Sequence, residues 1–418
     1  MPSTLRDTAP ASLSLPEAER IGLMDGLRGI ALAGVFAINI DFFNRPVHAL
    51  GMGIGDAAGI DRVAAVLALA LVQGKFWVLF SLLFGMGFAV MARRAEAAGR
   101  PFVARFLRRT LLLALFGALH IALFWVGDIL LTYAMAALLL LVFLRLRGAA
   151  LWIVGGLLYV GPVLALALFG VLIQLAPAGA REGINAEFAA LAANGAAAAV
   201  VYATGDFAAV AAQRLADYTA LALPNSAFLL SSVLGVFLIG VWLVRSGRLD
   251  DVAGNRAFFL RMAIAGIVVG APLVALSLAI GVEFDPLTDG GRATLATSTM
   301  MLGSLPLALG YFALLALLSL TASGGRWVAA FAPVGRMALT HYLMQSVIAS
   351  LLFYGYGLGL AGEVGRATQL GMVAVVFIAQ LVFSHWWLAR FQYGPMEWLW
   401  RAGTHLALPP FHRGGRRG

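Results

Sequence analysis

A histidine and an aspartate lie eight residues apart where one apolar run ends and the next begins. His120 falls near the end of the first of these runs, and Asp128 opens the second. Because the turn between them is tight, the carboxylate can reach the imidazole, fix its tautomer and raise its basicity, as a general base requires. The alternative is that Asp128 only caps the following helix and His120 bonds a backbone carbonyl.

Charged groups also open the first apolar run. Asp25 and Arg28 are three residues apart, so they can pair on one helix. Arg28 could hold a phosphate or an acidic head group, or it could simply be a snorkelling arginine beside a helix-start acid. At 1.5 Å per residue, Asn39 lies about 16 Å deeper than Arg28, and we expect it to face the protein interior.

Two further polar clusters lie near the C-terminal end. Arg336 opens one of them, and His341 and Gln345 follow four residues apart on one helix face. This polar stripe could line a cofactor channel or make ordinary interhelical hydrogen bonds. In the other cluster, the segment with Trp398, Trp400 and Arg401 is typical of an aromatic and basic membrane anchor, and Glu397 and Arg401 are spaced for a surface ion pair.

The composition is that of an integral membrane protein. Of 418 residues, 61% are hydrophobic and 12% are charged, and the mean hydropathy is +0.91, which excludes a soluble fold. The net charge is +9, but the arginines cluster between apolar runs. We therefore expect the lipid bilayer as partner and no nucleic acid.

Several kinds of site are excluded or unsupported. The chain has no cysteine, which rules out disulfides, thiolate metal sites and cysteine nucleophiles. It also contains no His-Glu-x-x-His metal pattern, no Walker loop and no Gly-x-Ser-x-Gly elbow. We expect no metal and no permanently bound cofactor.

The apolar runs are long enough to cross the bilayer as helices. Residues 64–91 are too many for one straight span, and Gln73, Gly74 and Lys75 interrupt them, so this stretch is either one tilted helix or two segments. The expected fold is all-α and polytopic. We predict about ten transmembrane helices, at 27–43, 64–91, 108–125, 128–145, 149–175, 225–245, 257–281, 297–319, 335–356 and 367–389.

The arginines orient these helices. They concentrate in every second loop and in the C-terminal tail, whereas the alternate loops hold most of the acids. By the positive-inside rule both termini are cytoplasmic. The first apolar run follows a tail of more than twenty residues without a cleavage site, so it is expected to be a retained helix. The predicted organisation is a cytoplasmic tail (1–24), a membrane half of five helices (25–176), an extracytoplasmic amphipathic segment (177–224), a second membrane half (225–402) and a basic cytoplasmic tail (403–418).

The chain resembles the YeiB-like family of bacterial membrane proteins, whose C-terminal portion is a domain of unknown function numbered 418. The resemblance covers nearly the whole chain. That family is itself similar to membrane acyltransferases, including heparan-alpha-glucosaminide acetyltransferase and the acyltransferase-3 enzymes. The motifs that carry the resemblance are Asp25-Gly-Leu-Arg28-Gly through Asn39, Lys75-Phe-Trp with Phe80-Ser-Leu-Leu-Phe-Gly85-Met-Gly87, Gly117-Ala-Leu-His120 with Trp125-Val-Gly-Asp128, Gly335-Arg336-Met-Ala-Leu-Thr340, and Tyr393-Gly394-Pro-Met-Glu397-Trp-Leu-Trp400-Arg401.

The resemblance implies acyl transfer across the bacterial cytoplasmic (inner) membrane. An acyl-CoA or similar thioester would be the co-substrate, and a sugar or lipid of the envelope would accept the acyl group. His120, oriented by Asp128, would be the base, because Asn39 stands where acyltransferase-3 enzymes usually have a histidine. The relatives tend to carry asparagine at the position of His341, which argues against an essential role for this histidine. The candidate residues for binding the substrate or the acyl donor are Arg28, Asn39, Asp25, Lys75, Arg336, His341 and Gln345.

Two other functions fit the same residues. A transporter or lipid-handling protein would use the buried polar groups as a path through the bundle. A scaffold or sensor is favoured if these groups scatter to separate helix faces. A homo-oligomeric assembly is left open by the sequence.

Overall fold

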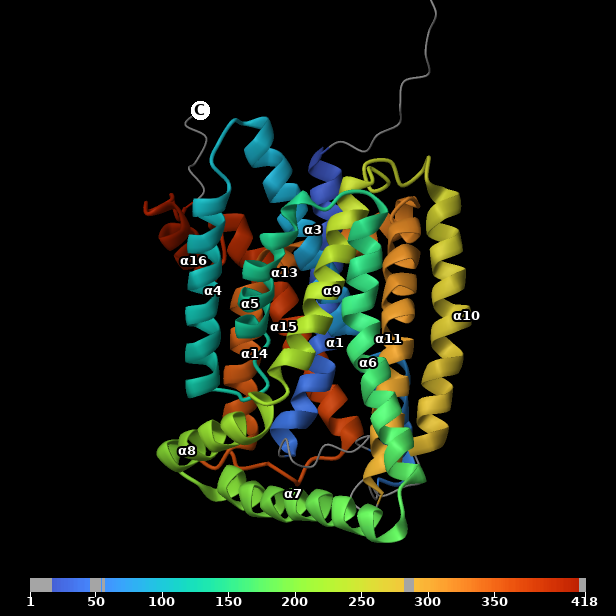
Figure 1. The fold of residues 1–418 in the computed structure, drawn as a ribbon. Helices are drawn as coiled ribbons and strands as arrows, with labels where there is room; N and C mark the ends of the chain where they lie inside the picture. Colours follow the sequence, from blue (N-terminus) through green and yellow to red (C-terminus); the bar gives the residue numbers. More distant parts are fainter. Residues whose placement is uncertain (1–16, 46–53, 55–56, 282–288, 413–418) are drawn as a thin grey trace, which may run out of the picture.

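A computed structural model describes residues 17–45, 54, 57–281 and 289–412, and the regular elements in this part of the chain are all helical. Most of the helices form an upright bundle. Two more helices lie across the end of the bundle that is at the bottom in Figure 1. In chain order they are α1 (Glu17–Asn44), α2 (Gly59–Leu71), α3 (Lys75–Ala97), α4 (Val103–Leu123), α5 (Leu130–Leu140), η2 (Val142–Arg145), α6 (Ala149–Leu175), α7 (Ala178–Thr204), α8 (Phe207–Asp217), η3 (Tyr218–Ala222), α9 (Ser226–Arg245), α10 (Arg256–Gly281), α11 (Gly290–Leu318), α12 (Ala322–Ala330), α13 (Ala332–Arg336), α14 (Ala338–Phe353), α15 (Arg366–Arg390) and α16 (Pro395–His405).

The all-α, polytopic fold expected from the sequence is confirmed. Within the described residues, nine helices are long and apolar enough to cross a membrane, and α5 and α14 are shorter apolar helices. Each predicted span has a helical counterpart. One of the nine, α7, lies across the end of the bundle instead of along it (Figure 1), and no crossing was predicted there.

The stretch 64–91 consists of two helices. The helical conformation is interrupted between α2 and α3, where Gly74 has a φ of 80°. Residues with a side chain rarely adopt this backbone conformation. The ammonium group of Lys75, the first residue of α3, donates a hydrogen bond of 2.8 Å to the carbonyl of Leu69 near the end of α2. Lys75 therefore satisfies a helix-end carbonyl at the break.

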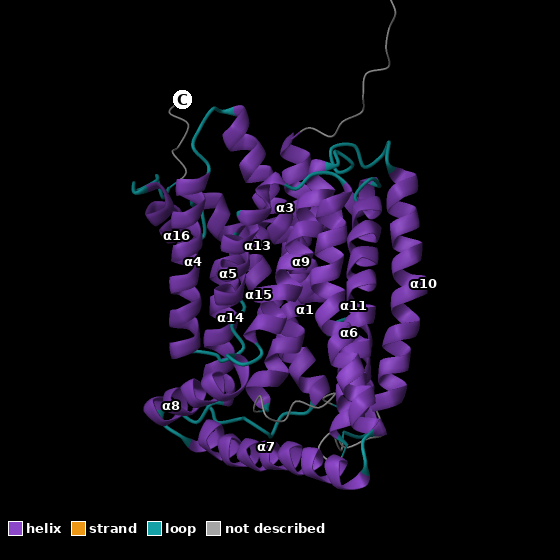
Figure 2. Cartoon of the chain, viewed as in Figure 1, coloured by secondary structure: helices purple, strands orange, loops and turns teal. Residues whose placement is uncertain are grey.

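The two ends of the bundle differ in charge. We call the end at which α1 begins and α16 lies the basic end (Figure 1). Arg94, Arg100 and Arg401 are exposed there. The loops gather at both ends of the bundle, as Figure 2 shows. The sequence thus placed the start of α1 and the C-terminal helix on the same side correctly.

Helices α7 and α8 cover the opposite end. The expected amphipathic helix is present as α8, but its buried residues are Val210, Arg214 and Asp217. The carboxylate of Asp217 is buried and accepts a hydrogen bond of 2.7 Å from the hydroxyl of Tyr202 on α7. The contact joins α7 to α8.

Candidate functional site

A cavity of about 650 Å³ opens at the basic end and extends into the bundle between α1, α3, α4, α5, α14 and α16. On α1 its lining runs from Met24 to Asn39. These fifteen steps of about 1.5 Å make the cavity roughly 22 Å deep along that helix. It is therefore a long channel whose inner end lies near Asn39.

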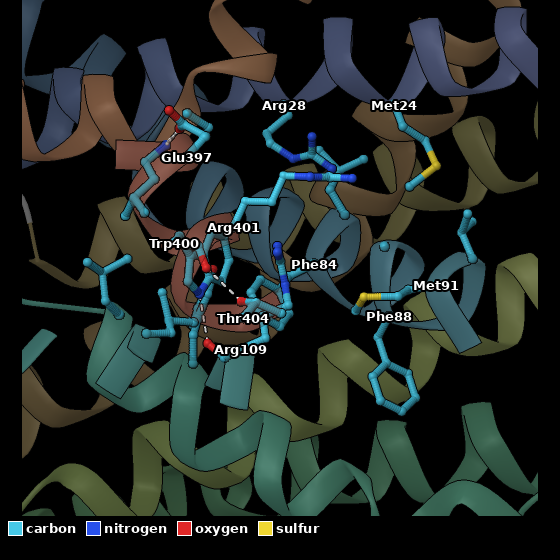
Figure 3. A pocket seen from close by; sticks show the side chains of 18 of the residues that line it. Met24, Arg28, Phe84, Phe88, Met91, Arg109, Glu397, Trp400, Arg401 and Thr404 are labelled. Carbon is cyan, nitrogen blue, oxygen red and sulfur yellow. Dashed lines mark hydrogen bonds between the residues drawn. The ribbon is translucent and has the colours of Figure 1, made fainter. Parts of the chain in front are cut away.

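The entrance of the cavity is strongly basic. Seven arginines and one histidine line it, against two acids, Asp25 and Glu397. Figure 3 shows Arg28, Arg109 and Arg401 coming from three different helices to this region. Because so many cations meet two carboxylates, the entrance is suited to bind an anion. The basic residues are Arg28, Arg94, Arg100, Arg105, Arg109, Arg336, Arg401 and His405.

Close packing between α13 and α1 builds one side of the entrance. A Cβ atom on Gly335 would lie only 1.8 Å from the carbonyl oxygen of Asp25, so only glycine allows this approach. Arg28 donates a hydrogen bond of 2.6 Å to Asp25, as the sequence spacing predicted. The Asp25-Arg28 pair and Arg336 consequently lie side by side at the entrance.

Helix α16 builds the other side. The guanidinium carbon of Arg109 lies 3.5 Å from the centre of the Trp400 ring, and Trp400 donates its indole N–H to the carbonyl of Arg109. These contacts hold α16 against α4. Trp400 and Arg401, which the sequence pattern predicted to be part of a membrane anchor, therefore line the cavity.

Glu397 does not form the expected surface pair with Arg401. Its carboxylate accepts the backbone N–H groups of Leu339 and Thr340, at 2.7 and 3.1 Å, and the hydroxyl of Thr340. A carboxylate from a separate helix thus caps the start of α14. Burial raises the pKa of Glu397, although these hydrogen bonds oppose the shift. The pKa of His405 is lowered by burial and by the neighbouring arginines, with Arg401 first.

The walls of the inner cavity are apolar and aromatic, with Leu32, Trp77 and Phe80 among them. The polar side chains at this depth are Asn39, Tyr133 and Tyr342. The cavity therefore combines a basic entrance with an apolar wall and a few polar groups at its inner end. This combination suits a ligand with an anionic head and a long uncharged arm.

The predicted contact between His120 and Asp128 is present. Nδ1 of His120 lies 2.8 Å from Oδ2 of Asp128, and both side chains are buried. Oδ1 of Asp128 accepts the backbone N–H of Leu131 at 2.8 Å. Asp128 thus orients the histidine and also caps α5, the two roles that the sequence set against each other. We call this His120–Asp128 pair the dyad.

The dyad has the tautomer of a general base. Because a carboxylate only accepts hydrogen bonds, the contact with Oδ2 requires a proton on Nδ1, and in the neutral imidazole the lone pair is then on Nε2. Nε2 is buried, and no hydrogen-bond partner for it lies among the described residues. Gly117 permits this arrangement, because a Cβ there would lie 2.4 Å from the backbone nitrogen of Leu131 and 2.8 Å from Oδ1 of Asp128.

The dyad lies behind the inner end of the cavity. His120 and Asp128 do not line it, but Gly127, Ile129 and Tyr342 do. The ring centres of Tyr342 and His120 are 5.2 Å apart. The dyad therefore adjoins the cavity wall at Tyr342 without lining the cavity itself.

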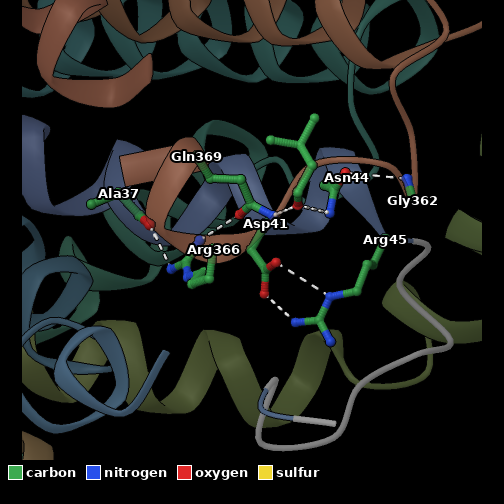
Figure 4. Close-up of polar contacts among 8 residues, drawn as sticks. Ala37, Asp41, Asn44, Arg45, Gly362, Arg366 and Gln369 are labelled. Carbon is green, nitrogen blue, oxygen red and sulfur yellow. Dashed lines mark hydrogen bonds and ion pairs between the residues drawn. The ribbon is translucent and has the colours of Figure 1, made fainter. Parts of the chain in front are cut away.

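A polar network holds the inner part of α1 against α15 (Figure 4). Arg366 donates a hydrogen bond of 2.8 Å to the carbonyl of Ala37 and one of 2.7 Å to the amide oxygen of Gln369. Asn44 donates to the carbonyl of Val364 at 3.1 Å. Because Asn39 lies between Ala37 and Asn44 on the same helix, the network fixes its position at the inner end of the cavity.

Three predicted residues lie outside the cavity. Nε2 of His341 lies 2.5 Å from Oγ of Ser384, and Gln345 donates a hydrogen bond of 2.9 Å to the amide oxygen of Gln380. Both residues therefore join α14 to α15 by interhelical hydrogen bonds. Lys75 is buried at the break between α2 and α3. The structure therefore brings together Asp25, Arg28, Asn39 and Arg336, with the dyad adjacent, but not these three.

The comparisons with known proteins agree with the resemblance read from the sequence. Residues 243–407 match the family described as "Protein of unknown function (DUF418)". The "Uncharacterized protein YxaH" of Bacillus subtilis (strain 168) is 32% identical over 94% of this chain and 96% of its own length. The "Uncharacterized protein YeiB" of Escherichia coli (strain K12) is 33% identical over 94% of this chain and 98% of its own length. No solved structure matches the chain.

Proposed function

This chain belongs to the DUF418 family of YeiB and YxaH, and we propose that it is a membrane acyltransferase. It takes an acyl group from a thioester at the basic end and transfers the group to an acceptor at the opposite face. One observation carries the proposal: the inner end of a cavity with a basic entrance lies beside a histidine whose tautomer is that of a base.

An acyl-CoA has the chemistry that the cavity requires. Its phosphates are anionic and suit the arginines of the entrance, Arg28 and Arg336 among them. Between its phosphates and its thioester runs a long, flexible and uncharged arm, which suits the apolar part of the channel, where Arg28 and Asn39 are about 16 Å apart along α1. The thioester then reaches Asn39 and the neighbourhood of the dyad.

The two sides of the membrane supply the two substrates. The positive-inside rule favours the cytoplasm for the basic end, and acyl-CoA is made there. We take the bacterial cytoplasmic membrane as the site of the reaction. The acceptor is a hydroxyl or amine of an envelope sugar or lipid on the other side. His120 takes the proton of this group as it attacks the thioester.

The test measures transfer directly. Purified protein in detergent receives acetyl-CoA with a labelled acetyl group and an envelope extract from cells that lack the protein. The expected result is labelled sugar or lipid with the wild type and none with His120→Ala. The proposal is wrong if folded wild-type protein transfers no label and the envelope of the deletion strain keeps all its acyl groups.

A second candidate is lipid handling, because a basic entrance above an apolar channel also fits an anionic phospholipid. The two functions separate in liposomes that carry a fluorescent anionic phospholipid. Lipid handling requires that the reconstituted protein moves this lipid between leaflets and that acetyl-CoA is left intact. An acyltransferase consumes acetyl-CoA and leaves the lipid distribution unchanged.

A further inference from the structure

Tyr342 lines the cavity, and its ring also packs beside the imidazole of His120 in the dyad. We propose that its hydroxyl donates a hydrogen bond to the carbonyl oxygen of the bound thioester and stabilises the negative charge that develops there. The proposal rests on the acyltransferase function and adds a catalytic residue to it.

The position of Tyr342 supports this role. The side chain is 5% exposed, lines the inner cavity, and has its ring centre 5.2 Å from that of His120. Its hydroxyl oxygen lies 3.4 Å from the backbone nitrogen of Ile129 and accepts that N–H. Ile129 directly follows Asp128, so the hydroxyl is held next to the dyad.

The hydrogen bonding of Tyr342 leaves its proton available. Its hydroxyl acts as an acceptor toward Ile129, and in the described part of the chain no acceptor takes the phenolic proton. Tyr133, the other tyrosine of the inner cavity, differs. The Tyr133 hydroxyl lies 2.7 Å from Oγ of Ser81 and donates to the carbonyl of Trp77 at 3.3 Å. Only the Tyr342 hydroxyl of these two is free to donate to a ligand.

The reaction needs such a donor at this depth. The oxygen or nitrogen of the acceptor attacks the thioester carbon, its proton passes to Nε2 of His120, and the electron pair of the C=O bond moves onto the carbonyl oxygen. The electron pair on that oxygen then re-forms the C=O bond as the C–S bond breaks. The sulfur leaves with the electron pair of the C–S bond and takes the proton from the imidazolium, which gives a free thiol. Arg28, the entrance arginine on α1, lies roughly 16 Å from Asn39 along that helix, too far to stabilise this charge.

The test compares two buried tyrosines in the purified full-length protein, with acetyl-CoA as the probe and release of the CoA thiol as the readout. Tyr342→Phe should lower kcat by about 10²–10³, the usual effect of removing one donor to a developing oxyanion, with the KM for acetyl-CoA and the affinity for CoA unchanged. The control is Tyr159→Phe, which removes a buried hydroxyl bonded to the carbonyl of Met301 outside the cavity.

The outcomes separate the two proposals. A wild-type protein that releases no thiol, with or without envelope extract, overturns the acyltransferase function and this inference with it. An active wild type with Tyr342→Phe equal to Tyr159→Phe in kcat overturns the role of Tyr342 alone. A loss that appears in KM and CoA affinity instead of kcat also overturns it, because the hydroxyl then acts in ground-state binding.

Discussion

Oδ2 of Asp128 lies 2.8 Å from Nδ1 of His120, while Oδ1 of the same carboxylate holds the backbone N–H of Leu131. One side chain therefore orients the histidine and begins the next helix. This double contact makes the position of the imidazole depend on the turn between α4 and α5. It also leaves Nε2 without a partner in the described part of the structure, beside the inner end of the cavity.

Removing the base should abolish transfer without unfolding the protein. His120→Ala is expected to lower kcat for thiol release from acetyl-CoA by about 10²–10⁴, the usual contribution of a general base. Asp128→Asn should also lower kcat, because an amide has one acceptor oxygen and one NH2 donor and cannot accept from both Nδ1 of His120 and the N–H of Leu131. The control is His385→Ala, which removes an exposed imidazole. An equal effect of His120→Ala and His385→Ala would contradict the assignment.

The entrance arginines should control affinity for the donor. Arg28→Gln is expected to weaken CoA binding about tenfold, since a charge-assisted hydrogen bond contributes about 1.5–3 kcal/mol and Arg28 is only half-buried. Arg336→Gln should have a smaller effect, because Arg336 is exposed and its charge is screened. Calorimetric titration with CoA at low and high salt checks both. Arg181→Gln, in the exposed part of α7, is the matched control, and an equal loss of affinity there would argue against a specific site.

A methyl group at residue 117 should displace the dyad. Gly117→Ala would place a Cβ against Leu131 and Asp128, so we expect a loss of about 1–3 kcal/mol in stability from overpacking together with a lower kcat. Gly156→Ala meets nothing within 4 Å and is the control. It should keep full activity and gain about 0.4–1 kcal/mol, as compatible Gly-to-Ala changes do. Thermal unfolding and thiol release check the two variants, and a fully active, equally stable Gly117→Ala would refute the steric argument.

Glu397 should make stability depend on pH. Burial raises its pKa above the ordinary 4.5, so folding favours the protonated form. This contribution is complete below pH 4.5 and is lost as the pH rises through the raised pKa. Relative to Glu397→Gln, which does not titrate, the wild type should therefore lose Tm across that interval. Glu187→Gln, an exposed acid on α7, should keep the wild-type profile, and a constant difference between wild type and Glu397→Gln at every pH would disprove the coupling.

The sequence by itself determined the fold class, the apolar spans and the local pairs. Hydrophobic run length sets whether a segment can cross a bilayer, and arginine placement sets its direction. Short spacings place Asp25 near Arg28, and a tight turn places Asp128 near His120, because neighbours on one helix or across one turn have little freedom to separate. The Asp25–Arg28 contact at 2.6 Å and the His120–Asp128 contact at 2.8 Å could therefore be predicted without the packing of the bundle.

Only the tertiary structure decided which of these groups share the cavity. Helical spacing shows which residues lie on one face, but not which neighbouring helix that face meets. Trp400 bonds the carbonyl of Arg109 across 291 residues, and Glu397 caps α14 at Thr340 across 57. Such distant packing brought α16 into the cavity wall and placed Tyr342 beside the dyad. It also left His341 and Lys75 outside, because Nε2 of His341 meets Ser384 of α15 and the ammonium group of Lys75 bonds the carbonyl of Leu69 at a helix end.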